Sequence, residues 1–329
     1  MKLLKNLAKT SPEEQARFFS SFDHLLTDMD GVIWLAYRPL PGAVEFINGL
    51  KKRGKTIRYV TNNSLASVET IWNILKKKGF DAEIDDLATP IISGIAYLRR
   101  MSIDKAIFAI GSQEMKEELR KAGLKVYPDP PQQIDESLPS LLQLLQDDEN
   151  VGAVFFNFDP NLTFIKMQMM LTFLKRDDCH YIVGPGDKHI PVGPLGPIAG
   201  NYHHNKCIEE ISGRTATLIA KPSQFYADFI NKKFGIADPT RVLFVGDSIA
   251  EDMNIATMAG FQKLLVLTGA ASIQDVQNWK YPEEHKPEYF VESLDVLNNI
   301  FKSLDRLGLN IPDGFLLRTK VPHSIEIMN

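Results

Sequence analysis

Short apolar runs that stop abruptly at polar residues mark the strands that we predict from this chain. Four such runs stand out: 25–27 before Asp28-Met29-Asp30-Gly31, 56–60 before Thr61-Asn62-Asn63-Ser64, 218–220 before Lys221-Pro222-Ser223, and 241–245 before Gly246-Asp247. In open α/β sheets, ligands bind beyond the carboxyl ends of the strands. We therefore expect the polar residues after the four runs to line one crevice.

Helical periodicity and additional strands separate the second run from the third. Val68, Ile71, Trp72 and Leu75 fall at i, i+3, i+4 and i+7, which predicts a helix that ends at Gly79. Beyond it we expect strands at 106–110, 152–156 and 181–183, and a helix at 164–174. This is far more chain than one crossover between parallel strands needs. The pattern predicts an α/β fold with a second α/β unit inserted into the first.

The two carboxylates at the end of the first run are the strongest chemical signal. In an extended strand, residues i and i+2 point the same way, so Asp28 and Asp30 can share one site. Two such acids suit a metal ion, or a nucleophile with an acid/base partner. Taken alone, the stretch is better explained as a turn, because Asp and Gly also favour turns.

The other strand ends support the chemical interpretation. We expect Asp28 to attack a phosphorus atom and become an aspartyl-phosphate, and Asp30 to protonate the leaving alcohol and then activate water. The Thr61 hydroxyl, the backbone amides around Asn62 and Asn63, and the Lys221 ammonium are expected to hold phosphoryl oxygens.

A hard cation completes this prediction. Asp28, the main-chain carbonyl of Asp30, and Asp247 form an oxygen ligand set typical of Mg²⁺, which would offset repulsion between an anionic nucleophile and a phosphate. Asp252 is expected to orient Lys221 or the waters of the metal.

The four motifs, in this order, resemble those of the haloacid dehalogenase superfamily of phosphohydrolases. Within it, Asp28-Met29-Asp30-Gly31-Val32-Ile33-Trp34, Ile110-Gly111-Ser112 and Tyr289-Phe290-Val291 resemble the group of phosphoglycolate phosphatase, chronophin and 4-nitrophenyl phosphatase. The resemblance runs from about residue 12 to about residue 300. It implies a doubly wound, Rossmann-like parallel-sheet core formed by residues 1–97 and 214–329, a large α/β cap formed by residues 98–213, and a homodimer formed through the cap.

Departures from the family pattern fall around the site. The family's GDRxxTD is here Gly246-Asp247-Ser248-Ile249-Ala250-Glu251-Asp252, so the Arg is missing while both Asp residues remain. Changes between residues 183 and 200 fall where the family's cap carries specificity, and they leave the substrate open. Asp187 and His189 lie in this stretch, either as leaving-group contacts or as ordinary polar loop residues.

Several other polar residues have alternative explanations. His203, His204 and Cys207 have a spacing that zinc could use, but an i, i+1 His pair diverges on a helix and a fourth ligand is missing. Asp159 either structures the cap or touches substrate. The segment after Ile300 adds an edge strand, packs on the core or is disordered; the sequence does not choose among these.

Composition narrows the cellular locations and the kinds of partner that we expect. The chain has 329 residues, a net charge of −4 and two cysteines, Cys179 and Cys207. These values give no basic footprint for nucleic acid and no disulfide framework. The chain also has no apolar run of transmembrane length and no signal-peptide core, and Ser11-Pro12-Glu13-Glu14 is typical of a helix start. We expect a cytoplasmic protein without nucleic-acid or membrane partners.

These observations predict a Mg²⁺-dependent phosphatase that hydrolyses small phosphomonoesters of the phosphoglycolate, pyridoxal phosphate, glycerol phosphate or 4-nitrophenyl phosphate type. Three alternatives stay open. One is a catalytically weak or inactive binding or scaffold protein on the same fold, and another is a phosphotransferase that shares the intermediate. The third is a phosphorylated signalling receiver, although a receiver needs neither Asp30 as an acid nor a large insert.

Overall fold

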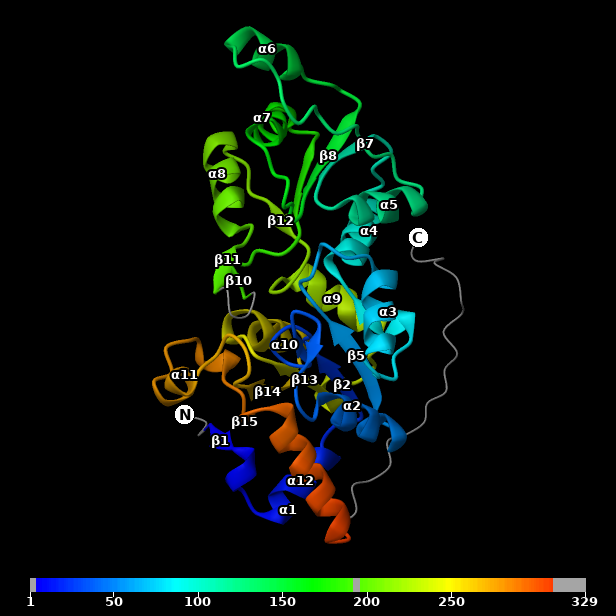
Figure 1. Cartoon of the computed structure of the whole chain (residues 1–329), viewed down its shortest axis with the longest axis vertical. Coiled ribbons are helices and arrows are strands. Elements are labelled where there is room, and N and C mark those ends of the chain that lie inside the picture. Colours follow the sequence, from blue (N-terminus) through cyan, green and yellow to red (C-terminus); the bar gives the residue numbers. More distant parts are fainter. Residues whose placement is uncertain (1–3, 192–195, 310–329) are drawn as a thin grey trace.

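Two parallel sheets organise the chain in the computed structural model, which describes residues 4–191 and 196–309 (Figure 1). The seven-stranded sheet has the spatial order β1 (Lys5–Asn6), β15 (Tyr289–Val291), β14 (Gln262–Val266), β13 (Val242–Gly246), β2 (His24–Thr27), β5 (Thr56–Val60) and β6 (Leu87–Ala88). The four-stranded sheet has the order β12 (Thr217–Leu218), β9 (His180–Val183), β8 (Val151–Phe156) and β7 (Ala106–Ile110).

The order of the larger sheet shows that it is wound in two directions. From β2 the chain adds β5 and then β6 on one side, whereas β13 lies on the other side of β2 and is followed outward by β14 and β15. Every neighbouring pair in this sheet is parallel. The predicted fold class, a doubly wound parallel-sheet core with an inserted α/β unit, is confirmed.

Both faces of the larger sheet are covered because successive residues of its strands alternate between two apolar clusters. Leu25 of β2 packs in one cluster and Leu26 in the other. The helices on the Leu25 face are α1 (Pro12–Ser20), α2 (Ala43–Lys52), α3 (Val68–Lys77) and α12 (Leu294–Arg306). The helices on the Leu26 face are α9 (Gln224–Lys233) and α10 (Asn254–Ala259).

The smaller sheet is covered in the same way and forms the upper part of the molecule in Figure 1. One face packs against α4 (Pro90–Arg100) and α5 (Gln113–Lys121), and the other against α7 (Phe164–Phe173) and α8 (Tyr202–Ser212). The remaining elements include α6 (Leu138–Leu144), α11 (Ile273–Gln277), and the hairpins β3 (Trp34–Leu35) to β4 (Arg38–Pro39) and β10 (His189–Pro191) to β11 (Pro197–Ala199).

Local signals in the sequence account for several element boundaries. The side chain of Ser11 accepts a hydrogen bond from the Glu14 amide, so α1 begins at Pro12 as predicted. Helix α3 ends two residues before Gly79, which adopts a φ of 92° that favours glycine. The predicted strands at 106–110, 152–156 and 181–183 are β7, β8 and β9.

One strand prediction was wrong in its placement. The run at 218–220 was expected to end at the crevice of the core sheet, but β12 stops at Leu218 and pairs with β9 in the smaller sheet. The Ile219 amide donates to Val183 O, and the Ile219 side chain packs among the residues between α4 and that sheet. Lys221 therefore reaches the core from the connection that returns from the inserted unit.

The boundaries of the cap, 98–213, stay a prediction. Helix α4 begins before residue 98, and β12 follows residue 213 although it belongs to the smaller sheet. The predictions that concern residues 310–329, and part of the stretch 183–200, fall outside the described residues. None of the described helices is long and apolar enough to cross a membrane.

Candidate active site

The candidate site lies where three neighbouring strands of the core end. Asp28 follows β2, Thr61 follows β5 and Asp247 follows β13, and β2 lies between the other two strands. The winding of the sheet changes direction between β2 and β13, and ligands of open α/β sheets bind at such a point. A cavity of about 340 Å³ opens there, and the candidate residues from all four motifs line it.

A buried lysine links two of the carboxylates. Lys221 Nζ donates to Asp28 Oδ1 at 2.6 Å and to Asp252 Oδ1 at 2.8 Å, and its side chain is 2% exposed. Burial disfavours its charge, but the two carboxylates outweigh burial and hold the pKa of Lys221 well above its usual range. Lys221 therefore stays cationic beside the predicted nucleophile.

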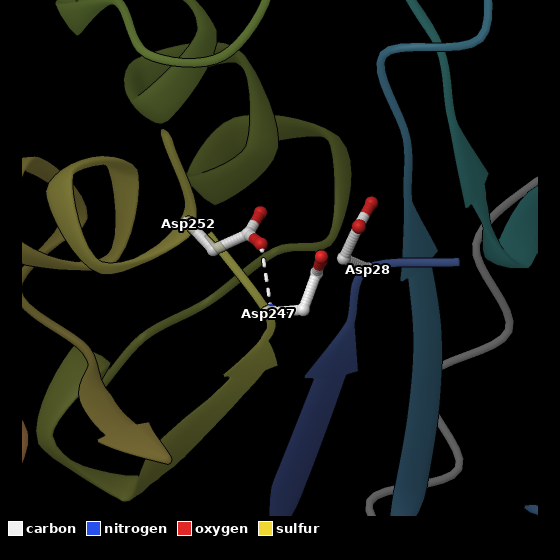
Figure 2. Close-up of side chains that lie close together, drawn as sticks. All are labelled: Asp28, Asp247 and Asp252. Atoms are coloured by element: carbon white, nitrogen blue, oxygen red, sulfur yellow. Dashed lines mark hydrogen bonds between the residues drawn. The ribbon is translucent and has the colours of Figure 1, made fainter. Parts of the chain in front are cut away.

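Asp252 holds other groups of the site in place through both of its carboxylate oxygens. Besides Lys221, it accepts hydrogen bonds at Oδ2 from the amides of Asp247 and Ser248, each at 3.0 Å. Figure 2 shows its carboxylate directed back toward the Asp247 backbone, while Asp28 and Asp247 project from adjacent strand ends. Asp252 thus orients both Lys221 and Asp247.

Asp247 occupies a space that two glycines leave free. A Cβ on Gly31 would lie 2.5 Å from Asp247 Oδ2, and one on Gly269 would lie 1.9 Å from the same atom. The Ala270 amide donates to this oxygen at 2.6 Å. Any larger residue at position 269 would displace the carboxylate.

The crowding of carboxylates suits a cation. Carboxylate oxygens of Asp28, Asp247 and Asp252 lie within 4.8 Å of one another. Burial, and then repulsion by Asp252, raises the pKa of Asp247 to about 7. Hard oxygen ligands in such a group fit Mg²⁺, and a bound cation would remove the electrostatic cost of ionising Asp247.

Asp30 sits in a tight loop after β2. The amides of Val32, Ile33 and Trp34 all approach Met29 O, and the Gly31 amide donates to Trp34 O. The Asp30 side chain is half-buried, and burial raises its pKa to about 6. A carboxyl group with this pKa can donate a proton near neutral pH and later accept one.

The side chains of the second motif hold the loops of the site together. Thr61 Oγ1 accepts from the Asn63 amide at 3.0 Å, and Asn63 Nδ2 donates to Tyr37 Oη at 2.9 Å. Asn62 clamps the backbone of Lys221, since its Oδ1 accepts from Lys221 N and its Nδ2 donates to Lys221 O. Both asparagine side chains are therefore engaged within the protein, and phosphate contacts at these positions would come from Thr61 and the backbone amides.

The inserted unit covers the cavity with Asp187 and His189, together with Phe158, Pro185, Ile190 and Ile198. Asp187 Oδ2 lies 3.4 Å from Asn62 Nδ2, whereas His189 is largely exposed and begins the β10–β11 hairpin. Both residues line the cavity, as the leaving-group hypothesis requires.

Two cavity residues were missed in the sequence. Glu251 accepts a hydrogen bond from Asn62 Nδ2 at 3.3 Å, and its presence in place of the Thr of the family motif was the available signal. Tyr37 lines the cavity from the turn between β3 and β4, and no pattern in the sequence pointed to it.

Two alternative explanations from the sequence can be compared with the structure. Asp159 pairs with Lys166 Nζ at 2.6 Å and accepts from the Asn161 amide, which supports a role in structuring the cap. His203, His204 and Cys207 lie on α8, and within residues 4–191 and 196–309 only Asp28, Asp247 and Asp252 form a group with metal-binding geometry.

Together, the doubly wound sheet, the inserted unit and the Asp–Lys–Asp site at the switch point define a capped hydrolase with a doubly wound core. Two family models match the chain: haloacid dehalogenase-like hydrolase over residues 25–125, and a haloacid dehalogenase hydrolase-like model over residues 218–297. The chain belongs to the haloacid dehalogenase-like hydrolases, as the motifs predicted, and its enzyme class is that of the phosphoric monoester hydrolases.

Individual relatives agree with this placement. Glycerol-3-phosphate phosphatase of Mus musculus is 27% identical over 299 residues, which cover 87% of this chain and 93% of the relative. The 4-nitrophenylphosphatase of Schizosaccharomyces pombe is 28% identical over 293 residues, covering 87% of this chain and 96% of the relative.

Solved structures share the fold. A 4-nitrophenylphosphatase from Thermotoga maritima superposes with a TM-score of 0.71 at 25% identity, covering 85% of this chain and 98% of the other. A glycerol phosphate phosphatase from Mycobacterium tuberculosis, determined in complex with magnesium, has a TM-score of 0.69 at 20% identity, covering 89% and 78%. The second likeness concerns the fold alone.

Proposed function

We propose that this protein is a Mg²⁺-dependent phosphatase that hydrolyses small phosphomonoesters through an aspartyl-phosphate on Asp28. One observation carries the proposal: Lys221 Nζ, fully buried, bridges Asp28 and Asp252 at the base of a cavity into which Asp30 also opens. A lysine fixed in this way can neutralise an incoming phosphate while it holds the nucleophile in one orientation.

The metal site would consist of Asp28, Asp247 and the main-chain carbonyl of Asp30. The donor set and the crowding of Asp28 and Asp247 fit the ion, and Lys221 Nζ bonds to only one oxygen of Asp28, Oδ1. When bound, Mg²⁺ would withdraw charge from the phosphoryl oxygens and lessen their repulsion of the carboxylate.

In the first half-reaction, an oxygen of Asp28 forms a bond to phosphorus as the bond from phosphorus to the alcohol oxygen breaks. Asp30, with a pKa raised by burial to about 6, gives its proton to the departing alcohol. Lys221 and the Thr61 hydroxyl hold the oxygens of the phosphoryl group during transfer.

In the second half-reaction, Asp30 accepts a proton from a water molecule whose oxygen attacks the phosphorus of the aspartyl-phosphate. The bond between phosphorus and Asp28 breaks, which releases phosphate and restores the Asp28 carboxylate. The same carboxyl group thus serves as acid and then as base, and the reaction leaves Asp30 protonated for another turnover.

The cap favours small substrates. The cavity of about 340 Å³ is closed on one side by residues of the inserted unit, which leaves room for a small phosphomonoester and not for a folded phosphoprotein. Assembly as a homodimer through the cap stays a prediction.

The test is a steady-state screen of small phosphorylated metabolites with Mg²⁺, ranked by kcat/KM. We expect release of inorganic phosphate from at least one of them, together with an acid-quenched covalent phosphoprotein that Asp28→Asn abolishes. If no phosphomonoester is hydrolysed faster by the wild type than by Asp28→Asn, the proposal is wrong.

A further inference from the structure

A second pair of carboxylates, distinct from those around Lys221, lies where the core and the cap meet in the same cavity. Glu251 belongs to a short π-helical turn, Ile249–Met253, that follows β13, whereas Asp187 belongs to the cap loop that precedes β10. Both side chains line the cavity. The proposed reaction uses neither of them.

One asparagine holds the two acids together. Asn62 Nδ2 lies 3.3 Å from Glu251 Oε2, 3.4 Å from Asp187 Oδ2 and 3.1 Å from Lys221 O. An amide nitrogen has two hydrogens, so three acceptors share two donors. The two carboxyl groups also hydrogen-bond to each other, and their remaining acceptor positions are available to a ligand.

The backbone of Asp187 is fixed, which places its carboxylate reproducibly. Asp187 O accepts from the Tyr202 amide at 3.1 Å. Gly200 lies so close that a Cβ there would be 2.1 Å from Asp187 O. Asp187 is thus anchored to the N-terminus of α8, and its carboxylate lies beside that of Glu251.

Neither Glu251 nor Asp187 forms an ion pair within residues 4–191 and 196–309. The charge of Lys221 lowers the pKa of both groups from a distance, but its ammonium group bonds to Asp28 and Asp252. Burial raises the pKa of both groups, and the charge of Asp187 raises that of Glu251 further. When the two acids share one proton through their mutual hydrogen bond, one negative charge remains at this end of the cavity.

This charge discriminates among the alcohols that a small phosphomonoester can carry. A hydroxyl or ammonium group can donate to the unfilled carboxylate positions, and an ammonium group also gains from the charge. A carboxylate in the same place would be repelled by it.

We propose that Glu251 and Asp187 form a selectivity pair, which favours phosphomonoesters whose alcohol carries hydroxyl or ammonium donors and disfavours those whose alcohol carries a carboxylate. The inference rests on the proposed phosphatase function and names the substrate class of the same site. It assigns a role to Glu251, which stands where the resembling motif has a Thr.

The experiment compares four substrates of the Mg²⁺-loaded enzyme at pH 7. The probes are 2-aminoethyl phosphate, glycerol 3-phosphate, phosphoglycolate and, as a reference without these groups, 4-nitrophenyl phosphate. We expect kcat/KM of the wild type for each of the first two to exceed that for phosphoglycolate by at least about tenfold.

Two isosteric variants test each member of the pair. Glu251→Gln and Asp187→Asn should each reduce the ratio of kcat/KM for 2-aminoethyl phosphate over phosphoglycolate by about tenfold or more, through loss of the charge. Their kcat/KM for 4-nitrophenyl phosphate, whose alcohol carries neither group, serves to normalise each ratio for any general loss of activity. Glu209→Gln is the matched control, since Glu209 is a cap acid on α8 that pairs with Lys206 and does not line the cavity.

The outcomes distinguish failure of the selectivity pair from failure of the proposed phosphatase function. A wild type that hydrolyses 4-nitrophenyl phosphate but prefers phosphoglycolate would overturn the inference and leave the phosphatase proposal intact. A ratio unchanged within about twofold in either folded variant would also overturn it, because the two acids lie on separate elements and each variant tests one member of the pair. A wild type that hydrolyses none of the four would refute both proposals.

Discussion

The base of the cavity, which Asp28, Lys221, Asp247 and Asp252 form, is built differently from its roof, which Asp187 and His189 of the cap form. At the base, Asp28, Lys221, Asp252 and Asp247 form a continuous set of hydrogen bonds between 2.6 and 3.0 Å, and Asp28 and Asp247 directly follow buried strands of the core. At the roof, Asp187 contacts Asn62 at a long 3.4 Å and hydrogen-bonds to Glu251, and His189 is exposed. The comparison indicates that the chemistry is fixed by preorganised groups, whereas selectivity depends on a few loop side chains.

The physical origin of the difference lies in the elements. Parallel strands in register bring their ends to one edge, so residues from distant parts of the sequence meet with little freedom. The cap residues come from a loop and a hairpin, whose positions depend on how the inserted unit packs over the core. Changes at the base should therefore affect all substrates, and changes at the roof only some of them.

The largest effect is expected at the nucleophile. Asp28→Asn keeps the size of the side chain but removes the attacking charge, so kcat should fall by at least about a thousandfold for every phosphomonoester. Steady-state rates on good and poor substrates measure this. Activity within tenfold of the wild type would contradict the assignment of Asp28 as the nucleophile.

Removal of a metal carboxylate should have a similarly general effect. Asp247→Ala should abolish activity at millimolar Mg²⁺ and raise the metal concentration that is needed. Ca²⁺ should inhibit the wild type, because its longer bonds and looser coordination misplace Asp28 relative to phosphorus. Titration of activity with each metal after treatment with EDTA is the measurement, and full activity in EDTA would contradict the metal-assisted mechanism.

Asp30 should show a dependence on the leaving group that Asp28 lacks. Asp30→Asn should slow hydrolysis of alkyl phosphates by about two to four orders of magnitude, and slow 4-nitrophenyl phosphate less, since nitrophenolate needs little protonation. In the wild type, kcat for alkyl phosphates should fall as pH rises through the pKa of Asp30, about 6 without metal, because the protonated fraction falls. Equal losses for good and poor leaving groups would refute the role as general acid.

The same contrast explains what the sequence could predict. Asp28, Asp30, Thr61 and Asp247 were found because each follows a strand whose apolar run ends visibly, and strand ends in an α/β sheet converge. Lys221 was found for a reason that proved partly wrong, since the run before it belongs to the other sheet. Its position depends on the connection that returns from the cap to the core. The resemblance to the family motif indicated Lys221, whereas the strand pattern did not.

Glu251 and Tyr37 show where prediction from sequence stops. Glu251 approaches Asp187 because a core turn and a cap loop meet at Asn62, a contact between residues far apart in the chain. Tyr37 enters the cavity through the turn of a short hairpin, where its φ is 62°. Neither arrangement follows from periodicity or spacing, because the first depends on how the cap loop meets the core and the second on the conformation of a short hairpin.

Matched glycine substitutions can sharpen the comparison between base and roof. Gly269→Ala would place a Cβ 1.9 Å from Asp247 Oδ2, whereas Gly186→Ala, beside Asp187 in the cap loop, would meet Leu218 Cδ1 at an ordinary 3.6 Å. We expect a loss of about a hundredfold in kcat for Gly269→Ala through displacement of the carboxylate, and a change within about threefold for Gly186→Ala. Equal effects in the two variants, with unchanged circular dichroism, would mean that the base is less rigid than its hydrogen bonds indicate.

The smallest and most selective effect is expected at His189. His189→Ala should change kcat/KM unevenly across phosphomonoesters, by about 1–3 kcal/mol for those whose alcohol loses a hydrogen bond and by little for the others. Lys221→Met should instead impair every phosphomonoester alike, because Lys221 contacts the nucleophile and faces the phosphoryl group that all of them share. The measurement is the profile of kcat/KM over several substrates for both variants. If His189→Ala keeps the rank order and spacing of the wild type, this histidine does not read the leaving group, and selectivity rests on the other residues that line the roof.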